Sequence, residues 1–551
     1  MSNQKKGKSD FLVQGSILAA ASLISRIIGL IYRIPMTNTI GNAGNSYYSS
    51  AYEIYNILLL ISAYSLPTAV SKLVSVRIAR GQRKNAYRIV KGALLLACCT
   101  GLAASLILYF GAEALTELFR SPLSIYALKV LAPTVFVVAV LGVLRGFFQG
   151  LGTMMPSAFS QILEQIVNAV VSVVAAILLY GYGARIGAVL GDAEKYGSAY
   201  GAAGGTLGTN LGALAALLFI GLLFLGYKRV FRSRMARDVS DKTESYGTII
   251  KILLLTIIPV LLSTTIYNIS AIIDLGIYKN VAVAQGYDID LLDDWWGIFT
   301  GKYKTIINIP IAIASAMATS CVPNLTAAYA SRKKKAVRHQ INVSIRFIMV
   351  IAFPCMVGVA VLASPILQLL YHDSSETSAK ILCYGSIAIL FYTLSTLSNG
   401  LLQGINRLRE PVKNAAIALV LHIACLLVLM YGLDLNIYAV VYSNAFFSFC
   451  MCVLNAHSLK KYSGYRQEKL KTFVIPCFSS AVMGVAVYYS YHLLQNWLQR
   501  NAISTVAAIA AGILVYAVMM LLLRGLGEEE IRKFPKGAVL VRGLKKLHLL
   551  R

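Results

Sequence analysis

The sequence contains few charged residues and, among these, few acidic ones. Asp, Glu, Lys and Arg make up 13% of its 551 residues, whereas hydrophobic residues make up 57%, and the mean hydropathy is +0.68. In ordinary soluble domains about a quarter of the residues are charged. The composition therefore excludes an ordinary soluble protein and indicates an integral membrane protein.

The sequence also lacks the motifs of metal sites and of common enzymes. Its cysteines form no CxxC motif and no cluster with histidine, which argues against structural disulfides and a zinc site. No nucleotide-binding motif is present, and no outer loop is long enough to hold the catalytic carboxylates of a membrane glycosyltransferase. We therefore expect neither an enzyme nor a bound cofactor or metal.

Long apolar runs are what the sequence has in abundance. About 20 apolar residues are needed to cross the hydrocarbon core of a bilayer. The runs of suitable length are 11–37, 47–76, 89–111, 125–150, 157–182, 200–226, 248–280, 296–330, 341–370, 379–404, 411–433, 435–458, 471–495 and 501–524. The sequence predicts an all-α integral membrane protein with fourteen transmembrane helices.

The basic residues are distributed as a membrane topology requires. Lys and Arg outnumber Asp and Glu by 51 to 23, and a nucleic-acid-binding protein would concentrate this excess on one soluble face. Most basic residues instead fall in alternate short loops, as the positive-inside rule demands. The segments expected in the cytoplasm are 1–10, 77–91, 227–251, 331–346, 405–413, 458–471 and 524–551. We expect a membrane protein with both termini in the cytoplasm, and the aspartates around 288–294 in water outside.

Six basic residues belong neither to the cytoplasmic segments nor to the segments on the opposite side. They are Arg26, Arg33, Lys72, Lys129, Arg145 and Lys304. A charge at bilayer depth costs about 2.5 to 3.5 kcal/mol on insertion scales, so such residues usually have a function. Arg26 and Arg33 are seven residues apart, which places them on one helix face about 10.5 Å apart along the axis. We expect Arg26 to line a wet cavity, whereas Arg33, Lys72 and Arg145 could reach toward the interface and Lys304 could contact lipid headgroups.

Three acidic residues within the spans are candidates for pairing with these charges. They are Glu53, Glu164 and Asp274. A carboxylate in a cavity of low dielectric either pairs with a cation or takes up a proton. We expect pairing with Arg26 or Arg33, with proton coupling as the alternative.

The chain contains an internal repeat with an offset of about 250 residues. "ISRIIGLIYR" (24–33) aligns with "ISAIIDLGIYK" (269–279), and a G-x-x-Q-G motif occurs at 146–150 and again at 400–404. An even number of spans separates the copies, so the two six-helix repeats run in the same orientation. Parallel repeats of this kind build transporters whose site lies between the halves, and the basic residues suggest that such a cavity binds an anion.

The repeat divides the chain into predicted segments. They are an N-terminal repeat at 1–226, a basic cytoplasmic linker at 227–247, a C-terminal repeat at 248–458, two further helices at 471–524 and a basic tail at 525–551. The tail is expected to lie on the anionic inner leaflet or in solvent. Gly204, Gly208 and Gly212 recur every four residues and predict a face for close helix packing.

The segments "LISRIIGLIYRIP", "LPTAVSKLVS", "RGFFQGLGTMMPSAFSQILEQIVNAVVS" and "LLQGINRLREPVKNA" carry a family resemblance. Together they resemble the polysaccharide-transport branch of the multidrug/oligosaccharidyl-lipid/polysaccharide (MOP) exporter superfamily, in its stage V sporulation protein B and YtgP-like group, which is related to the MurJ lipid II flippases. The resemblance implies a flippase of the bacterial plasma membrane for an undecaprenyl-pyrophosphate-linked oligosaccharide such as lipid II, working by alternating access. It implies that Arg26 lines the cavity, whereas Arg33 lies one residue beyond the second expected arginine and Glu53 stands where MurJ has an arginine.

The resemblance also defines the expected partners and the alternatives. The partners it implies are an anionic lipid-linked glycan, membrane lipids and enzymes of cell-wall synthesis, with no nucleic acid. A flippase for another cell-surface polysaccharide or for a spore-cortex intermediate would show the same features. A multidrug antiporter of the same superfamily would share the repeat, but it binds cations and would need an acidic cavity.

Overall fold

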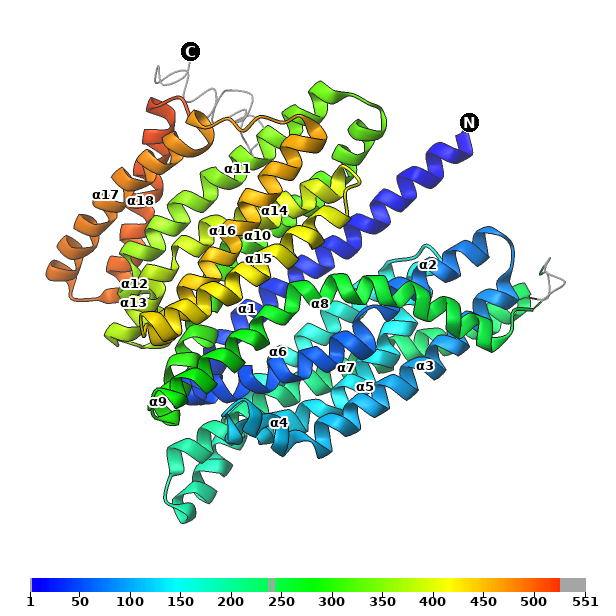
Figure 1. Ribbon diagram of the computed structural model, residues 1–551, viewed down its shortest axis with the longest axis horizontal. Coiled ribbons are helices and arrows are strands. Elements are labelled where there is room, and N and C mark those ends of the chain that lie inside the picture. Colours follow the sequence, from blue (N-terminus) through cyan, green and yellow to red (C-terminus); the bar gives the residue numbers. More distant parts are fainter. Residues whose placement is uncertain (1, 236–237, 239–242, 526–551) are drawn as a thin grey trace. The chain divides into compact units, whose positions relative to one another are not determined.

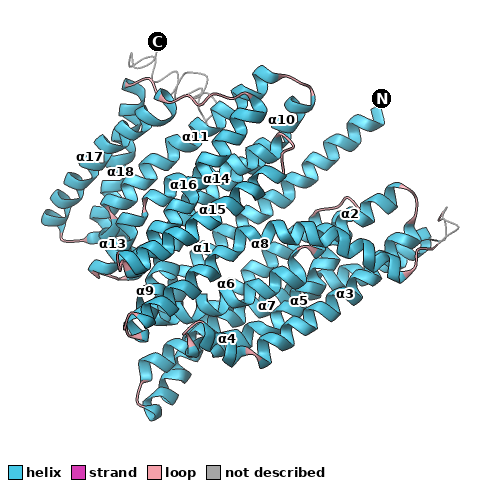
Figure 2. Cartoon of the chain, viewed as in Figure 1, coloured by secondary structure: helices cyan, strands magenta, loops and turns pink. Residues whose placement is uncertain are grey.

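The computed structural model describes residues 2–235, 238 and 243–525. These residues form helices joined by short turns, and no strand occurs among them (Figure 2). The all-α prediction is therefore confirmed. Residues 526–551 of the predicted tail and residues 236–237 and 239–242 of the predicted linker lie outside the described residues, so the expectations for both stay predictions.

The helices have the length and apolar character of membrane spans. In the described part of the chain, eleven are long and apolar enough to cross a membrane, and a bent pair, α13 and α14, would make a twelfth. One of the eleven, Ala20–Ala79, contains nearly all of the first two predicted spans. The protein is thus a multi-pass membrane protein, while the number fourteen stays a prediction.

The chain divides into two compact units. Unit 1 contains residues 1–301 and 426–437, and unit 2 contains residues 302–425 and 438–551. The helices of unit 1 are α1 (Ser2–Leu59), η1 (Leu60–Tyr64), α2 (Leu66–Ala79), α3 (Arg83–Phe110), α4 (Ala112–Leu118), η2 (Pro122–Ser124), α5 (Ile125–Gly150), α6 (Met155–Leu190), α7 (Ala193–Met235), α8 (Tyr246–Ala284), α9 (Ile289–Gly297) and η4 (Val428–Gly432). Those of unit 2 are α10 (Lys304–Ala330), α11 (Lys334–Val361), α12 (Ala363–Tyr371), α13 (Glu376–Gly385), α14 (Ile387–Gly404), most of α15 (Arg409–Leu427), α16 (Asn436–Ser463), η5 (Leu470–Val474), α17 (Ile475–Leu498) and α18 (Asn501–Leu522). The π-helical turn η3 (Ile298–Tyr303) spans the boundary, and α8, the first helix of the predicted second repeat, packs within unit 1 (Figure 1).

The long first helix changes direction at a glycine. Gly41 interrupts α1 with φ +70° and ψ −173°, a backbone conformation that side-chain-bearing residues rarely adopt. The break falls between the first two predicted spans, 11–37 and 47–76. It therefore separates a half of α1 that carries Arg26 and Arg33 from a half that carries Glu53.

Glycines allow close packing of α7 on α6 in unit 1. A Cβ atom added to Gly208 would lie 2.1 Å from Ser172 Oγ, and one added to Gly212 would lie 2.6 Å from the carbonyl oxygen of Glu164. Gly204 is equally close to the α6 backbone, at 2.4 Å from the carbonyl oxygen of Ala175. This confirms the packing face predicted from the four-residue spacing.

The G-x-x-Q-G motif makes the same kind of contact in each unit. In unit 1, Gly146 on α5 packs against α2, where an added Cβ would lie 2.6 Å from the carbonyl oxygen of Pro67. In unit 2, Gly400 and Gly404 on α14 pack against α10, where added Cβ atoms would lie 2.7 Å from Ala318 Cβ and 2.9 Å from Leu325. The fourth span thus packs on the second in both copies, as the sequence repeat leads one to expect.

The last two helices pack on α11 and α12 within unit 2. Met483 and Val487 of α17 join one apolar cluster with residues of α11 and α18. The Tyr516 hydroxyl donates to the carbonyl oxygen of Val350 at 2.8 Å, and Asn501 Nδ2 donates to that of Pro365 at 3.1 Å. These hydrogen bonds satisfy polar side chains that would otherwise be buried in apolar surroundings.

Candidate functional site

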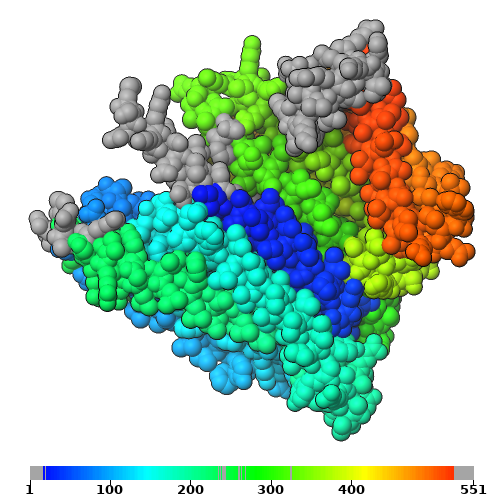
Figure 3. All heavy atoms as spheres, turned by 180° about the vertical axis from the view of Figure 1, so that it is seen from behind, coloured from blue at the N-terminus to red at the C-terminus, as the bar shows by residue number. Residues whose placement is uncertain are grey.

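A stripe of polar side chains runs along α6 and faces α1 and α5 in unit 1. Its members recur every three or four residues, so they share one helix face. They are Ser157, Ser160, Gln161, Glu164 and Asn168. Ser22 Oγ of α1 donates to Gln161 Oε1 at 3.3 Å, and Asn168 Nδ2 donates to the Tyr32 hydroxyl at 3.3 Å. Figure 3 shows the dark-blue part of α1 beside the cyan α6.

Glu164 on this stripe forms an ion pair with Arg145 of α5. Arg145 Nη2 lies 2.7 Å from Glu164 Oε2, and Arg145 Nε donates to Ser160 Oγ at 2.8 Å. Both side chains are largely buried, with 14% and 22% of their surface exposed. The sequence predicted an ion pair for Glu164 but the wrong partner, since Arg26 and Arg33 were expected. The positive charge of Arg145 and the negative charge of Glu164 cancel, so the pair carries no net charge.

Arg26 and Arg33 lie on an unbroken helical stretch of α1, so their predicted common face is retained. Arg26 is exposed, among apolar side chains that are exposed as well, such as Ile27 and Ile31. Arg33 is half-buried, and its guanidinium lies over the ring of Tyr48, with Cζ 5.2 Å from the ring centroid.

Arg33 keeps unused hydrogen-bonding capacity. Its Nε atom is buried and has no hydrogen-bond partner among the described residues. A buried N–H group without a partner is unfavourable by about 1 to 3 kcal/mol, and more when the group is charged. An anionic ligand that accepts from this group would remove that penalty.

The other predicted site residues are spread over both units. Lys72 on α2 is exposed, and Glu53 on the second half of α1 is half-buried. Asp274 on α8 is fully buried, with 1% of its surface exposed. Lys304 begins α10 and is half-buried, but it belongs to unit 2. Within unit 1 the structure brings Arg145 and Glu164 together, and the binding roles of all these residues stay predictions.

A buried polar junction joins the second half of α1 to α8 and α9, and sequence reasoning missed it. Lys279 of α8 and Asp293 of α9 form an ion pair with 0% and 2% of their side chains exposed. Ser46 Oγ of α1 donates to Asp293 Oδ1 at 2.5 Å, and Asn42 Nδ2 donates to Asp294 Oδ1 at 2.8 Å. The expectation that this aspartate cluster faces water is therefore wrong for Asp293.

A sequence signal for this junction was present. Gly297 and Gly301 follow Asp293 at four-residue spacing, so all three share one face of the helix. A Cβ atom added to Gly297 would lie 1.8 Å from the carbonyl oxygen of Asn42, and one added to Gly301 would lie 2.7 Å from the side chain of Asn45. A small-residue face of this kind indicates close packing rather than solvent.

A second ion pair that the sequence did not reveal lies in unit 2. Lys302 Nζ is 2.5 Å from Asp373 Oδ2, and only 8% and 12% of the two side chains are exposed. Burial raises the pKa of Asp373, but hydrogen bonds from Lys302 and from neighbouring groups outweigh burial and hold that pKa below its usual value. Asp373 therefore stays ionised and paired at neutral pH.

Comparison with known proteins identifies relatives along nearly the whole chain. A family model described as "Polysaccharide biosynthesis protein" matches residues 12–328, and a model described as MatE matches residues 303–428. Lipid II flippase MurJ of Bacillus subtilis is 26% identical over 531 residues, which cover 92% of this chain and 94% of the relative. Stage V sporulation protein B of the same organism is 24% identical over 533 residues, covering 96% and 98%.

The fold also matches that of a solved structure. The structure described as "Lipid II flippase MurJ, inward closed conformation" superposes with a TM-score of 0.62. The match covers 92% of this chain and 98% of that one, at 15% sequence identity. At this level of identity the match establishes a shared fold and nothing more.

Proposed function

Because the chain belongs to the polysaccharide biosynthesis protein family of the MOP superfamily, we propose that it flips an undecaprenyl-pyrophosphate-linked oligosaccharide across the plasma membrane, with lipid II as the substrate. The named relatives support this proposal, since two curated flippase and sporulation proteins align with more than nine-tenths of the chain. The multi-pass helical fold is what such a transporter requires.

The observation that carries the proposal is that Arg33 has an N–H group without a hydrogen-bond partner in the described part of the chain. It is a guanidinium within an apolar helix, stacked on Tyr48, with a buried N–H group that lacks a partner among the described residues. Arginine binds phosphate through two parallel hydrogen bonds, and a diphosphate needs such neutralisation to leave water. Arg26, two turns away and exposed, supplies a second guanidinium on the same helix.

The proposed cycle is alternating access. With the cytoplasmic side open, Arg26 and Arg33 bind the diphosphate, with Lys72, Lys304 and Arg145 as further contacts of the headgroup. The prenyl chain remains in lipid while the headgroup crosses. Since no nucleotide-binding motif is present, the energy comes from the membrane potential, an ion gradient or consumption of the product outside. One charge moving through 100 mV gains about 2.3 kcal/mol.

The coupling groups of the cycle would be acidic residues. Glu53, Glu164 and Asp274 are the candidates, and Glu164 would have to exchange its pairing with Arg145 during the cycle. A flippase for another cell-surface polysaccharide or a spore-cortex intermediate would use the same diphosphate site. A multidrug antiporter is the second candidate, favoured by the MatE match over residues 303–428. Its cationic substrates would be repelled by the arginines of α1, so we place it below the flippase.

Complementation tests the proposal directly. Cells depleted of their own lipid II flippase would express the wild type, Arg33→Ala, Arg26→Ala or the control Lys129→Ala, with membrane amounts matched by immunoblot. Lys129 is an exposed basic residue in a predicted span, 6.0 Å from the ring of Tyr109, so it matches the arginines in charge. Losing one charged hydrogen bond, about 1.5 to 3 kcal/mol, corresponds to about a 10- to 150-fold loss in affinity.

The outcomes test the substrate assignment and the arginine site separately. Growth with wild type and Lys129→Ala, but not with the arginine variants, supports both the lipid II assignment and the arginine site. Growth with every variant refutes the site. If the wild type fails to support growth and also fails to move a fluorescent lipid II in proteoliposomes, lipid II is not the substrate.

A further inference from the structure

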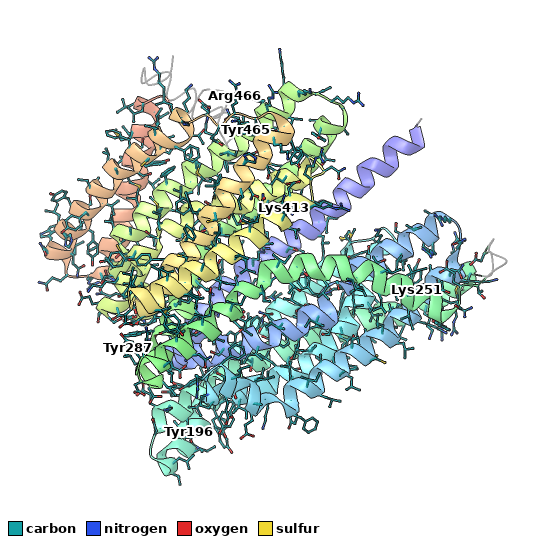
Figure 4. All side chains as sticks on the ribbon, viewed as in Figure 1. Tyr196, Lys251, Tyr287, Lys413, Tyr465 and Arg466 are labelled. Carbon is teal, nitrogen blue, oxygen red and sulfur yellow. The ribbon has the colours of Figure 1, made fainter. Side chains whose placement is uncertain are left out.

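An open cavity with a volume of 870 Å³ lies in unit 2, apart from the polar stripe of unit 1. It forms where the start of α11 meets the end of α16 and the segment between α16 and η5. Three candidate spans, Lys334–Val361, Asn436–Ser463 and Leu470–Leu498, have their ends here, so the cavity is at the level of the membrane interface. In Figure 4, Tyr465 and Arg466 of its wall lie next to each other at the upper end of unit 2.

The cavity is strongly basic. Its wall includes Arg338, Lys460 and Arg466, together with His339 and a single acidic residue, Glu468. Lys460 and Arg466 form no ion pair within the described part of the chain. The wall therefore carries an excess of positive charge even before the neighbouring loops are considered.

Glu468 does not neutralise this excess, because it is already engaged. It pairs with Arg346 and accepts a hydrogen bond from Asn342 Nδ2 at 3.1 Å. Although burial raises the pKa of Glu468, these contacts hold it below its usual value. Glu468 thus offsets the charge of Arg346, which is outside the lining of the cavity, and leaves the other cations uncompensated.

The basic side chains are partly held in place. Arg338 Nε donates to the carbonyl oxygen of Ser463 at 3.1 Å, and this hydrogen bond holds the Nε side of the guanidinium in place. The buried Tyr465 hydroxyl donates to Asn342 Oδ1 at 3.1 Å. Gly464 has φ +65°, and an added Cβ would lie 2.5 Å from Arg338 Nη2. A side chain at residue 464 would therefore displace this guanidinium, and the positive φ also favours glycine there.

We propose that this cavity binds a phosphate group through Arg338, Arg466 and Lys460. A fixed guanidinium donates two parallel hydrogen bonds to a phosphate, and lysine adds a mobile charge. The phosphate belongs either to the headgroup of an anionic lipid in the adjacent leaflet or to a small soluble molecule, because the cavity is at the interface and open to both. The site does not depend on the proposed flippase function, since no α1 residue contributes to it.

Binding to the purified full-length protein tests the proposal. Native mass spectrometry counts bound phosphatidylglycerol against phosphatidylcholine, and calorimetry measures the binding of inorganic phosphate. We expect Arg338→Gln and Arg466→Gln each to weaken binding about tenfold, or about 1.4 kcal/mol. Lys413→Gln is the matched control, because Lys413 is an exposed basic residue of the same unit that does not line the cavity (Figure 4).

A variant that keeps the charge separates geometry from general electrostatics. Gly464→Ala forces Arg338 to move, so it should weaken binding while Lys413→Gln does not. The thermal stability of Gly464→Ala in detergent is measured beside the binding. Arg466→Gln, which removes an exposed charge, tests the same cavity without backbone strain.

Each result supports or overturns the proposal. Selective loss of phosphatidylglycerol in the variants identifies a lipid headgroup as the ligand, whereas selective loss of inorganic phosphate identifies a soluble one. If the wild type binds phosphatidylglycerol no better than phosphatidylcholine and binds no phosphate, the proposal is wrong. It is equally overturned if Lys413→Gln weakens binding as much as the arginine variants do.

Discussion

The buried pair of Lys279 and Asp293 yields a prediction whose size follows from the structure. Both side chains are almost completely removed from solvent, and Ser46 also donates to the carboxylate. Removing one partner of such a pair leaves an unpaired buried charge, which lowers the free energy of unfolding by about 3 to 5 kcal/mol. We expect this loss for Asp293→Asn, which keeps the shape of the side chain and an acceptor for Ser46.

The double variant makes the prediction specific. Lys279→Met with Asp293→Asn removes both charges of this pair, and uncharged replacements of buried ion pairs are often nearly neutral. It should therefore recover most of the stability lost in Asp293→Asn. The exposed pair of Lys195 and Asp290, with 34% and 56% of the side chains exposed, is the control. Asp290→Asn should change the free energy of unfolding by no more than about 1 kcal/mol.

The assay is a reversible SDS titration of the purified protein in bicelles, which gives the free energy of unfolding for each variant. The wild type, Asp293→Asn, Lys279→Met and the double variant form a double-mutant cycle, and Asp290→Asn is measured beside it as the control. The reasoning is refuted if Asp293→Asn lies within about 0.5 kcal/mol of the wild type, the range usual for surface substitutions. In that case Lys279 would be neutral or hydrated in the folded protein.

Two further predictions concern close packing and pH. Gly297→Ala would place a Cβ 1.8 Å from the carbonyl oxygen of Asn42, so the free energy of unfolding should fall by about 1 to 3 kcal/mol or more in the same SDS titration. Gly181→Ala, with nothing within 4 Å, should be neutral or slightly stabilising. The lowered pKa of Asp373 means that its pair with Lys302 stabilises the fold above the ordinary aspartate pKa of about 4 and loses that effect as pH falls through the lowered pKa. Asp373→Asn should therefore unfold more readily than the wild type at pH 7, and the difference should disappear at the acid end of the titration.

The features predicted correctly from the sequence are those that local periodicity determines. Apolar runs predict helices because a backbone in lipid must satisfy its own hydrogen bonds. The spacing of Gly204, Gly208 and Gly212 predicts a packing face, because residues four apart on a helix lie on one side. The G-x-x-Q-G motifs likewise correspond to helix contacts in both units.

The features that sequence reasoning missed depend on which helices meet. Glu164 is closer in sequence to Arg145 than to the α1 arginines, but a single sequence does not rank three possible cations within one bilayer. Asp293 has three aspartate neighbours and therefore resembles a solvated loop. It is buried because α1 turns at Gly41 and packs its second half against α9. The pairing of Lys302 with Asp373 joins positions 71 residues apart and leaves no local signature.

The ion pairs also change the relative importance of the candidate substrate contacts. Arg145 is neutralised by Glu164, and Lys279 by Asp293, so neither adds net positive charge to unit 1. Arg33 forms no ion pair among the described residues; its guanidinium lies over the ring of Tyr48, and its buried Nε–H group has no hydrogen-bond partner there. A diphosphate needs in-plane donors of this kind. Arg33 is therefore a better candidate than Arg145 for binding the diphosphate. The sequence alone had favoured Arg26, which was expected to line a wet cavity.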